Sequence, residues 1–340
     1  MQWSKKEIKE QADKYGFIKD TFEKELRLIE VLDRFEKDEF LQGKLALKGG
    51  TCLNLFYLDG PRLSVDIDLD YVGKMSRDDM LKERVLIREH VQEIAEDLGY
   101  ERDDESKRYH ALESEVLSYI NNGGGKDNIK IEINYMDRQH VLPLQKRKIN
   151  VPWYGKEIST LCVNDLEIYA SKIAAFTNRY TARDLYDLGN LFDRYNGDAK
   201  NIEMVRKCAI FYRAIGSKEI PREIDYDMLD KLLIKPRGLE NILRKGEYFN
   251  AYKGYEKVQD FVTDTFRLNT DEKFFLDNFE NGRYNPELLF KGEQLERIEN
   301  HPMAMYKMKM YIIRELDKEA RQEKYKRGKD RGRDGPELGD

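Results

Sequence analysis

The sequence has few cysteines and histidines, and neither residue type forms a cluster. Its 340 residues include three cysteines and four histidines. The cysteines lie far apart and form no Cys-x-x-Cys pair, so we expect buried thiols in a reducing compartment. The histidines show no zinc-ligand spacing. The sequence therefore gives no indication of a disulfide framework or of a zinc site.

Long apolar runs and the common nucleotide-binding motifs are also missing. No run approaches the length of a transmembrane helix, and the charged N-terminal stretch does not read as a signal peptide. We therefore expect a cytoplasmic protein with no membrane partner. The lack of G-x-G-x-x-G argues against a Rossmann dinucleotide site, and neither a P-loop nor an internal repeat occurs. Because the net charge is −5, any nucleic-acid site must be a local basic patch.

The composition that remains is that of a globular protein with a heavily charged surface, 40% hydrophobic and 37% charged. The length suggests two domains. Helix and strand patterns alternate up to about residue 160, and helical patterns follow. We expect an α/β domain at 1–160 that starts with two packing helices, a helical domain at 161–318 and a flexible charged tail at 319–340. The basic cluster at 146–148 falls in a turn-rich link, where a solvated loop is a simpler interpretation than an RNA contact.

One stretch, residues 45–70, organises the first domain. It predicts a strand, a turn at Gly49-Gly50, a short helix with Thr51 as its N-cap, and a second strand. Residues 64–70 alternate strictly, which places three aspartates on one strand face, namely Asp66, Asp68 and Asp70.

Aspartates in line on one strand face repel each other, so a compensating cation is expected. The carboxylates of Asp66 and Asp68 project side by side, which suits Mg²⁺, with Mn²⁺ as the alternative. The preceding glycine turn and helix start offer backbone N–H groups to phosphates. The alternative is a solvated strand face that binds nothing, and the combination of the two features favours the metal site.

Two later segments add weaker signals. In the β-patterned segment at 100–134, Ile131 and Ile133 face inward and leave Glu132 on the other face, where a lone acidic residue is ordinarily solvated. In the helical segment at 165–191, Lys172 lies beside small residues. There Thr181 can cap a helix that contains the pattern Arg183-Asp184-x-x-Asp187. A lysine on a solvated face and an Arg–Asp pair at a helix start explain that second segment equally well.

These residues resemble a known family. Gly-Gly followed by an Asp-x-Asp strand resembles the nucleotidyltransferase superfamily of the DNA polymerase β type. The fuller pattern, Lys48-Gly49-Gly50-Thr51 and then Arg62-Leu63-Ser64-Val65-Asp66-Ile67-Asp68-Leu69, resembles the AbiEii/AbiGii toxins of abortive-infection and type IV toxin–antitoxin systems. The resemblance extends over about residues 40–310, and its motifs after residue 191 look structural.

The resemblance implies a fold and an activity. The fold is a nucleotidyltransferase core with a mixed β-sheet flanked by helices, followed by a helical C-terminal domain. The activity is transfer of NMP from an NTP to RNA, with tRNA 3′ ends as the acceptor class, which causes growth arrest and serves phage defence. An AbiEi-like antitoxin encoded nearby is the expected partner.

The resemblance also implies roles for individual residues. Asp66, Asp68 and Glu132 hold the metal, with Glu132 preferred over Asp127 or Asp137 because we expect those two in turns. Lys172 contacts phosphates, and Asp184 is a base or an orienting group. The remaining nucleotide-binding residues are Lys48, Gly49, Gly50, Thr51, Arg62, Ser64, Arg183 and Asp187.

Two other functions stay open at this point. The superfamily uses one metal site for many acceptors, so the acceptor could be a protein hydroxyl or a small molecule of the aminoglycoside type. A non-catalytic module that binds nucleotide or RNA is the other alternative. The intact Asp66/Asp68 pair argues against it, because a binding module has little need of two adjacent metal carboxylates.

Overall fold

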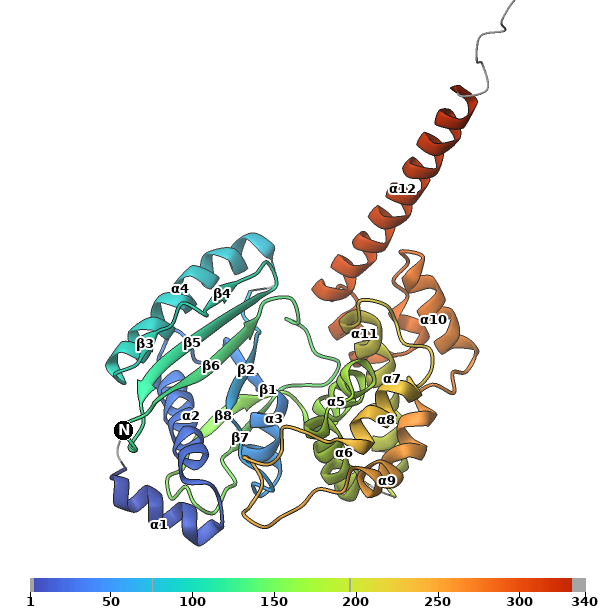
Figure 1. Cartoon of the computed structure of the whole chain (residues 1–340). Helices are drawn as coiled ribbons and strands as arrows, with labels where there is room; N and C mark the ends of the chain where they lie inside the picture. Colours follow the sequence, from blue (N-terminus) through green and yellow to red (C-terminus); the bar gives the residue numbers. More distant parts are fainter. Residues whose placement is uncertain (1–2, 75, 196, 332–340) are drawn as a thin grey trace, which may run out of the picture.

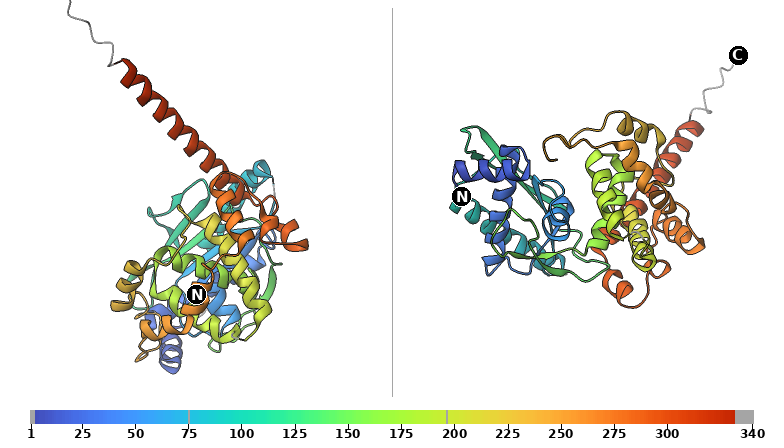
Figure 2. Two further views of the ribbon diagram at one scale, coloured as in Figure 1. Left: turned by 90° about the vertical axis from the view of Figure 1, so that its right-hand side faces the viewer. Right: turned by 90° about the horizontal axis from the view of Figure 1, so that it is seen from below.

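The computed structural model describes residues 3–74, 76–195 and 197–331. A β-sheet with its helices forms one half of the molecule, and a bundle of helices forms the other half beside it (Figures 1 and 2). The long C-terminal helix projects away from both. None of the helices in the described ranges is long and apolar enough to cross a bilayer. The mixed sheet flanked by helices is the predicted fold class.

The sheet is mixed, with the strand order β3-β5-β6-β2-β1-β8-β7, and β4 pairs with β5. The strands are β1 (Leu45–Lys48), β2 (Asp66–Tyr71), β3 (Glu101–Arg102), β4 (Lys107–Arg108), β5 (Leu112–Ile120), β6 (Lys126–Asn134), β7 (Gln145–Lys148) and β8 (Ser159–Cys162). Strand β2 runs antiparallel to β1 and parallel to β6. The two strands that carry the acidic motifs are therefore direct neighbours.

The alternation of apolar and polar residues decides which face of these central strands is buried. Ile67 and Leu69 of β2 and Ile131 and Ile133 of β6 are almost fully buried. The helices on the sheet side are α1 (Lys5–Tyr15), α2 (Lys19–Lys37), α3 (Gly49–Cys52), the π-helical turn η1 (Leu53–Tyr57) and α4 (Arg77–Asp97). Helix α2 packs on β6 and on α4. The polar side chains of β2 and β6 consequently leave the sheet on the opposite face.

The helical half begins directly after the last strand. Asn164 caps α5 through its side chain, which accepts a hydrogen bond from the Leu166 N–H. The helices are α5 (Asp165–Arg179), α6 (Ala182–Tyr195), α7 (Ala199–Gly216), α8 (Tyr226–Ile234), α9 (Ala251–Asp264), α10 (Thr270–Glu280), η2 (Pro286–Leu288), α11 (Gly292–Ile298) and α12 (Pro302–Arg331). Helix α5 packs along α7, and α6 packs along α9. The predicted domain division at residue 160 stays a prediction.

The structure differs from the sequence-based expectations at four places. Helix α12 continues to Arg331 where we expected a flexible tail from residue 319, and residues 332–340 lie outside the described ranges. The basic cluster at 146–148 belongs to edge strand β7 rather than to a loop. Asp127 lies in β6 and not in a turn. Thr51 is not the N-cap of α3, because the helix already begins at Gly49.

Candidate functional site

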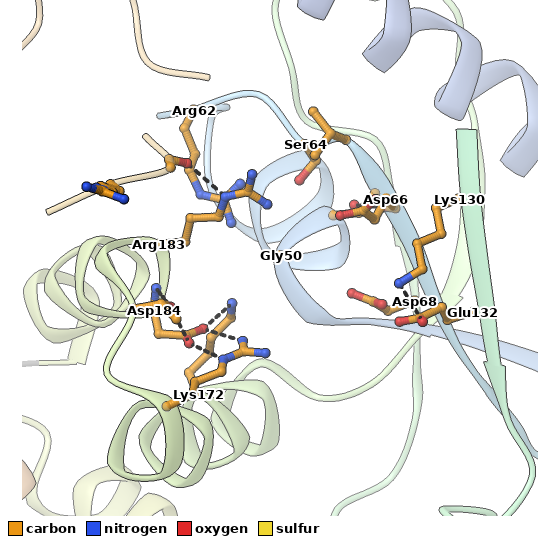
Figure 3. A pocket seen from close by; sticks show the side chains of 16 residues that line it. Gly50, Arg62, Ser64, Asp66, Asp68, Lys130, Glu132, Lys172, Arg183 and Asp184 are labelled. Atoms are coloured by element: carbon orange, nitrogen blue, oxygen red, sulfur yellow. Dashed lines mark hydrogen bonds and ion pairs between the residues drawn. The ribbon is translucent and has the colours of Figure 1, made fainter. Parts of the chain in front are cut away.

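A cavity of about 470 Å³ lies where the sheet meets the helical bundle. The turn into α3 and strands β2 and β6 form one wall, and α5 and α6 form the other. Figure 3 shows Asp66, Asp68 and Glu132 on the strand side, across the cavity from Lys172 and Asp184. Segments that are more than a hundred residues apart in the sequence therefore share one site, which we call the first cavity.

Three carboxylates from two strands line this cavity. Asp68 on β2 and Glu132 on β6 are partners in the strand register, and Asp66 is two residues before Asp68. Burial raises the pKa of Asp68. Lys48 opposes this shift, while the negative charges of Asp66 and Glu132 add to it. The carboxylates therefore form a concentration of negative charge that needs a cation.

Lys130 supplies part of that positive charge. Its Nζ lies 2.6 Å from a carboxylate oxygen of Glu132. Although partial burial opposes the charged form, Glu132, Asp66 and Asp68 raise the pKa of Lys130. Lys130 therefore stays protonated at the edge of the carboxylate cluster.

A divalent cation fits these residues chemically. Among the described residues, no group of three or more His, Cys, Asp or Glu side chains is gathered closely enough to form a ready metal site. The donors are nevertheless all carboxylate oxygens, which Mg²⁺ prefers, and burial together with the negative charges of Asp66 and Glu132 raises the pKa of Asp68. Asp66, Asp68 and Glu132 could thus hold a hard divalent cation together with phosphate oxygens and water.

The glycine turn is held tightly against the acidic strand. A Cβ atom at Gly49 would overlap the Asp68 carboxylate, and one at Gly50 would overlap the Arg62 guanidinium. Gly49 also has a φ of +69°, which favours glycine. The Thr51 hydroxyl donates a hydrogen bond to the Asp66 carbonyl oxygen. The turn therefore fixes the backbone of the acidic strand, and Gly50 and Thr51 line the first cavity.

A buried glutamate of α2 holds Ser64 in place at the cavity. Glu25 is fully buried, and it accepts hydrogen bonds from the Ser64 N–H (2.6 Å) and the Trp153 indole N–H (3.1 Å). Burial raises the pKa of Glu25 to about 8, against the lowering effect of these hydrogen bonds and of Arg62. Helix α2, which we expected only to pack, thus also positions a residue of the site.

On the helical wall, ion pairs form a continuous chain that is buried except at Arg179. Lys172 Nζ lies 3.1 Å from a carboxylate oxygen of Asp184 and 2.8 Å from one of Asp187. Arg62 reaches across from the sheet half and pairs with both oxygens of Asp187 at 2.8 Å. Arg179 pairs with Asp184 at 2.7 and 2.9 Å. Lys172 is therefore not on a solvated face, and this chain joins the two halves of the molecule.

Asp184 is held in its ionised form. Burial opposes ionisation, but Lys172, Arg179 and the Thr181 hydroxyl outweigh it and lower the pKa of Asp184 well below its usual range. A carboxylate with so low a pKa accepts a proton poorly at neutral pH. Of the two roles expected for Asp184, orienting Lys172 fits this geometry and that of a base does not.

Some predicted nucleotide-binding residues lie elsewhere. Lys48 and Gly49 line a second cavity instead, where Lys48 Nζ lies 2.5 Å from Asp70 and 3.6 Å from Asp137. Asp70 is consequently buried, whereas we expected it in a row of free strand carboxylates. Asp187 is not among the described residues that line the first cavity, although it binds both Arg62 and Lys172.

Arg62 and Arg183 line the first cavity but have protein partners. The guanidinium of Arg62 is held by Asp187, and Arg183 Nε donates to the Gly238 carbonyl oxygen. Cavity residues that were not predicted as site residues are Val65, Lys130, Arg179, Thr181, Arg237 and Gly238. Lys130 could have been found, because it lies two residues before Glu132 on the same strand face. We find no local sequence signal for Arg237 and Gly238, which lie between α8 and α9.

Comparisons with known proteins agree with the fold and indicate a family. The family model described as "Nucleotidyl transferase AbiEii toxin, Type IV TA system" matches residues 30–261. The fold is similar to that of a solved structure, MenT4, the nucleotidyltransferase toxin Rv2826c from Mycobacterium tuberculosis H37Rv. The match has a TM-score of 0.58 and 17% sequence identity, and it covers 89% of this chain and 99% of that chain. A sequence comparison with curated proteins gave no significant match.

Proposed function

Since the chain belongs to the AbiEii family of nucleotidyltransferase toxins from type IV toxin–antitoxin systems, we propose that it transfers NMP from an NTP to RNA, with a tRNA 3′ end as the acceptor. The observation that carries this proposal is the placement of Asp66, Asp68 and Glu132 opposite Lys172 in one cavity. A nucleotidyl transfer site needs carboxylates for a metal and cations for phosphates. The first cavity holds both.

The charge of the first cavity supports binding of a triphosphate. Its lining contains six cationic side chains and four carboxylates, and Asp187 pairs with two of these cations from outside the lining, so one cation is left in excess. The six cations are Arg62, Lys130, Lys172, Arg179, Arg183 and Arg237. Each phosphate group adds negative charge that these side chains can neutralise. We propose that the NTP lies here, with Gly50, Thr51 and Ser64 along its phosphates.

The proposed reaction joins an acceptor hydroxyl oxygen to the α-phosphorus and breaks the bond between that phosphorus and the bridging oxygen to the β-phosphate. Asp66, Asp68 and Glu132 would hold Mg²⁺ or Mn²⁺. When bound, this ion would neutralise part of the negative charge of the phosphates. Glu132 orients the acceptor hydroxyl and takes part in removing its proton. Pyrophosphate is the leaving group.

Lys172 balances charge on the leaving pyrophosphate. Although burial opposes its charged form, Asp187 and Asp184 raise the pKa of Lys172, so this largely buried side chain stays an ammonium ion. A fixed, buried cation costs little reorganisation during the reaction. Arg62, Asp187 and Asp184 orient this ammonium ion.

The cellular setting follows from the family. We propose that transfer to RNA arrests growth, that an AbiEi-like antitoxin encoded nearby counteracts it, and that the system defends against phage. The substrates of such a reaction are found in the cytoplasm, where the three free cysteines would also stay reduced. We further propose that a domain boundary near residue 160 makes the first cavity an interdomain cleft, a common location for ligand sites.

The test is incubation of the protein with each labelled NTP and Mg²⁺, together with total RNA, total protein or candidate small molecules. We expect label in an RNA band that resists protease and disappears with ribonuclease. Label that resists ribonuclease and disappears with protease would assign a protein acceptor and contradict the proposal. Label found only in a small molecule would contradict it as well.

A further inference from the structure

A second cavity of about 320 Å³ adjoins the first one. Four residues line both cavities and thus form the wall between them, namely Gly50, Asp68, Lys172 and Arg179. The volume of the second cavity falls within the range typical of ligand sites, about 300–1,000 Å³. Asp68 of the carboxylate cluster can therefore be reached from two compartments.

The second cavity contains buried polar atoms that have no hydrogen bond in the described structure. His140 lines it and is 7% exposed, yet neither ring nitrogen has a hydrogen-bond partner among the described residues. When protonated, the ring forms ion pairs with two carboxylates, those of Glu167 at 3.6 Å from Nδ1 and Asp70 at 3.7 Å from Nε2. The Oδ1 atom of Asp137 is also buried without a partner in the described structure. Because unsatisfied buried polar groups are costly, such groups in a cavity point to a hydrogen-bonding ligand.

The charges of the two cavities suit different ligands. The second cavity is lined by three permanent cations, Lys48, Lys172 and Arg179, and by four carboxylates. It therefore lacks the excess of cations that makes the first cavity suitable for a triphosphate. A neutral ligand with several hydrogen-bonding groups suits it better, and the ribose and base of a nucleoside have this character.

We propose that the second cavity binds the 3′-terminal nucleoside of the acceptor RNA, with His140 and Asp137 as hydrogen-bonding residues. This inference rests on the proposed function, because it assigns the second substrate of the same reaction. The NTP then lies on one side of Asp68 and the acceptor nucleoside on the other. Because Asp68 lines both cavities, the terminal hydroxyl of the RNA can reach this carboxylate from the second cavity while the phosphates of the NTP occupy the first cavity.

Two variants of the full chain test the proposal. Ala175→Leu narrows the second cavity without changing its charge, and Ala175 is not among the described residues that line the first cavity. His140→Phe removes the two ring nitrogens, which can form hydrogen bonds, and keeps a planar aromatic ring. Matched controls are Ala199→Leu and His110→Phe, at exposed positions outside both cavities. Thermal melting checks that all four variants fold.

The readouts are KM for RNA in the transfer assay and Kd for a fluorescent NTP without RNA. We expect both cavity variants to raise KM for RNA by about tenfold or more and to leave the Kd for NTP unchanged, because only acceptor contacts are lost. An unchanged KM for RNA in a folded variant would overturn the proposal. An equal rise in Kd for NTP would assign the cavity to the nucleotide and overturn it too. If the wild-type protein labels protein and not RNA, the proposed function is wrong about the acceptor, and the RNA nucleoside is then also wrong as the ligand of the second cavity.

Discussion

Asp68 and Glu132 are register partners on the parallel strands β2 and β6, and both side chains leave the sheet on the face toward the helical half. In a parallel pair, partner residues on one face project side by side. In the sequence, α4 and strands β3, β4 and β5 lie between β2 and β6. This register brings together the carboxylates on which the proposed chemistry depends.

The Glu132→Gln variant tests the role of the third carboxylate. We expect kcat to fall by about 10²-fold or more with little change in KM for NTP, because its charge matters most when the acceptor hydroxyl is activated. Steady-state kinetics with varied NTP measure both constants. Glu101→Gln, at an exposed position on β3, serves as the control. A wild-type kcat for Glu132→Gln would place the third carboxylate elsewhere.

Replacement of Lys172 should affect stability as well as transfer. Lys172→Ala leaves Asp184 and Asp187 with less compensating charge in a buried site, so we expect the free energy of unfolding to fall by about 3–5 kcal/mol. Transfer should fall strongly in the fraction that stays folded. Lys172→Arg should rescue transfer poorly, because a guanidinium is larger and directs its donors differently.

Denaturant unfolding and the transfer assay measure the two effects of Lys172. Lys5→Ala, on the exposed side of α1, should change neither. Lys172→Ala with wild-type stability and wild-type transfer would remove Lys172 from the site.

Lys130 should compete with a divalent cation for Glu132. Its side chain is 40% exposed, so the ion pair is worth about 0.2–1 kcal/mol, and its loss should tighten metal binding by up to about fivefold. We therefore expect Lys130→Met to bind Mn²⁺ more tightly without nucleotide, as measured by electron paramagnetic resonance. Lys126→Met on the same strand removes a lysine that pairs with Asp103 and should leave Mn²⁺ binding unchanged. Weaker Mn²⁺ binding by Lys130→Met would contradict the competition.

Glu25 should make stability depend on pH. Its pKa is raised from 4.5 in the unfolded chain to about 8 in the folded protein. Between these values the folded state binds more protons than the unfolded state. The contribution of Glu25 to the free energy of unfolding is therefore largest below pH 4.5 and falls as the pH rises toward 8. One proton gives a slope of at most ~1.4 kcal/mol per pH unit. We expect Glu25→Gln to have a flatter profile in denaturant unfolding from pH 5 to 9, and parallel profiles would contradict this.

The local pattern of the sequence was sufficient to predict the polar faces of the two acidic strands. The alternation around Asp66 and Asp68, and again around Glu132, separates residues that face the core from residues that face the site. The resemblance to a family, and not the pattern, indicated that Glu132 belongs near Asp68. Strand pairing between distant segments has no local signal, because it depends on how the whole sheet assembles.

Long-range electrostatic contacts account for most of what the sequence did not predict. Asp70 lies on the predicted face, but Lys48 and His140 cover it. In the sequence, Glu25 is one more charged residue of a helix, and only the fold brings Trp153 close enough to donate a hydrogen bond to it. Arg62 looks free to bind phosphate until Asp187 of the helical half pairs with it. The burial of Asp70, the environment of Glu25 and the ion pair of Arg62 each depend on a partner residue that only folding brings close.

Above all, we propose that the carboxylates of Asp66 and Asp68 carry NMP transfer to RNA. The most direct measurement is label transfer from NTP to RNA by wild type, Asp66→Asn and Asp68→Asn, with the melting temperature of each protein without metal. We expect labelled RNA from wild type only. We also expect an equal or higher melting temperature for Asp68→Asn, because burial and the neighbouring carboxylates raise the pKa of Asp68 and its charge destabilises the metal-free fold. Wild-type labelling of RNA by either variant would contradict the claim.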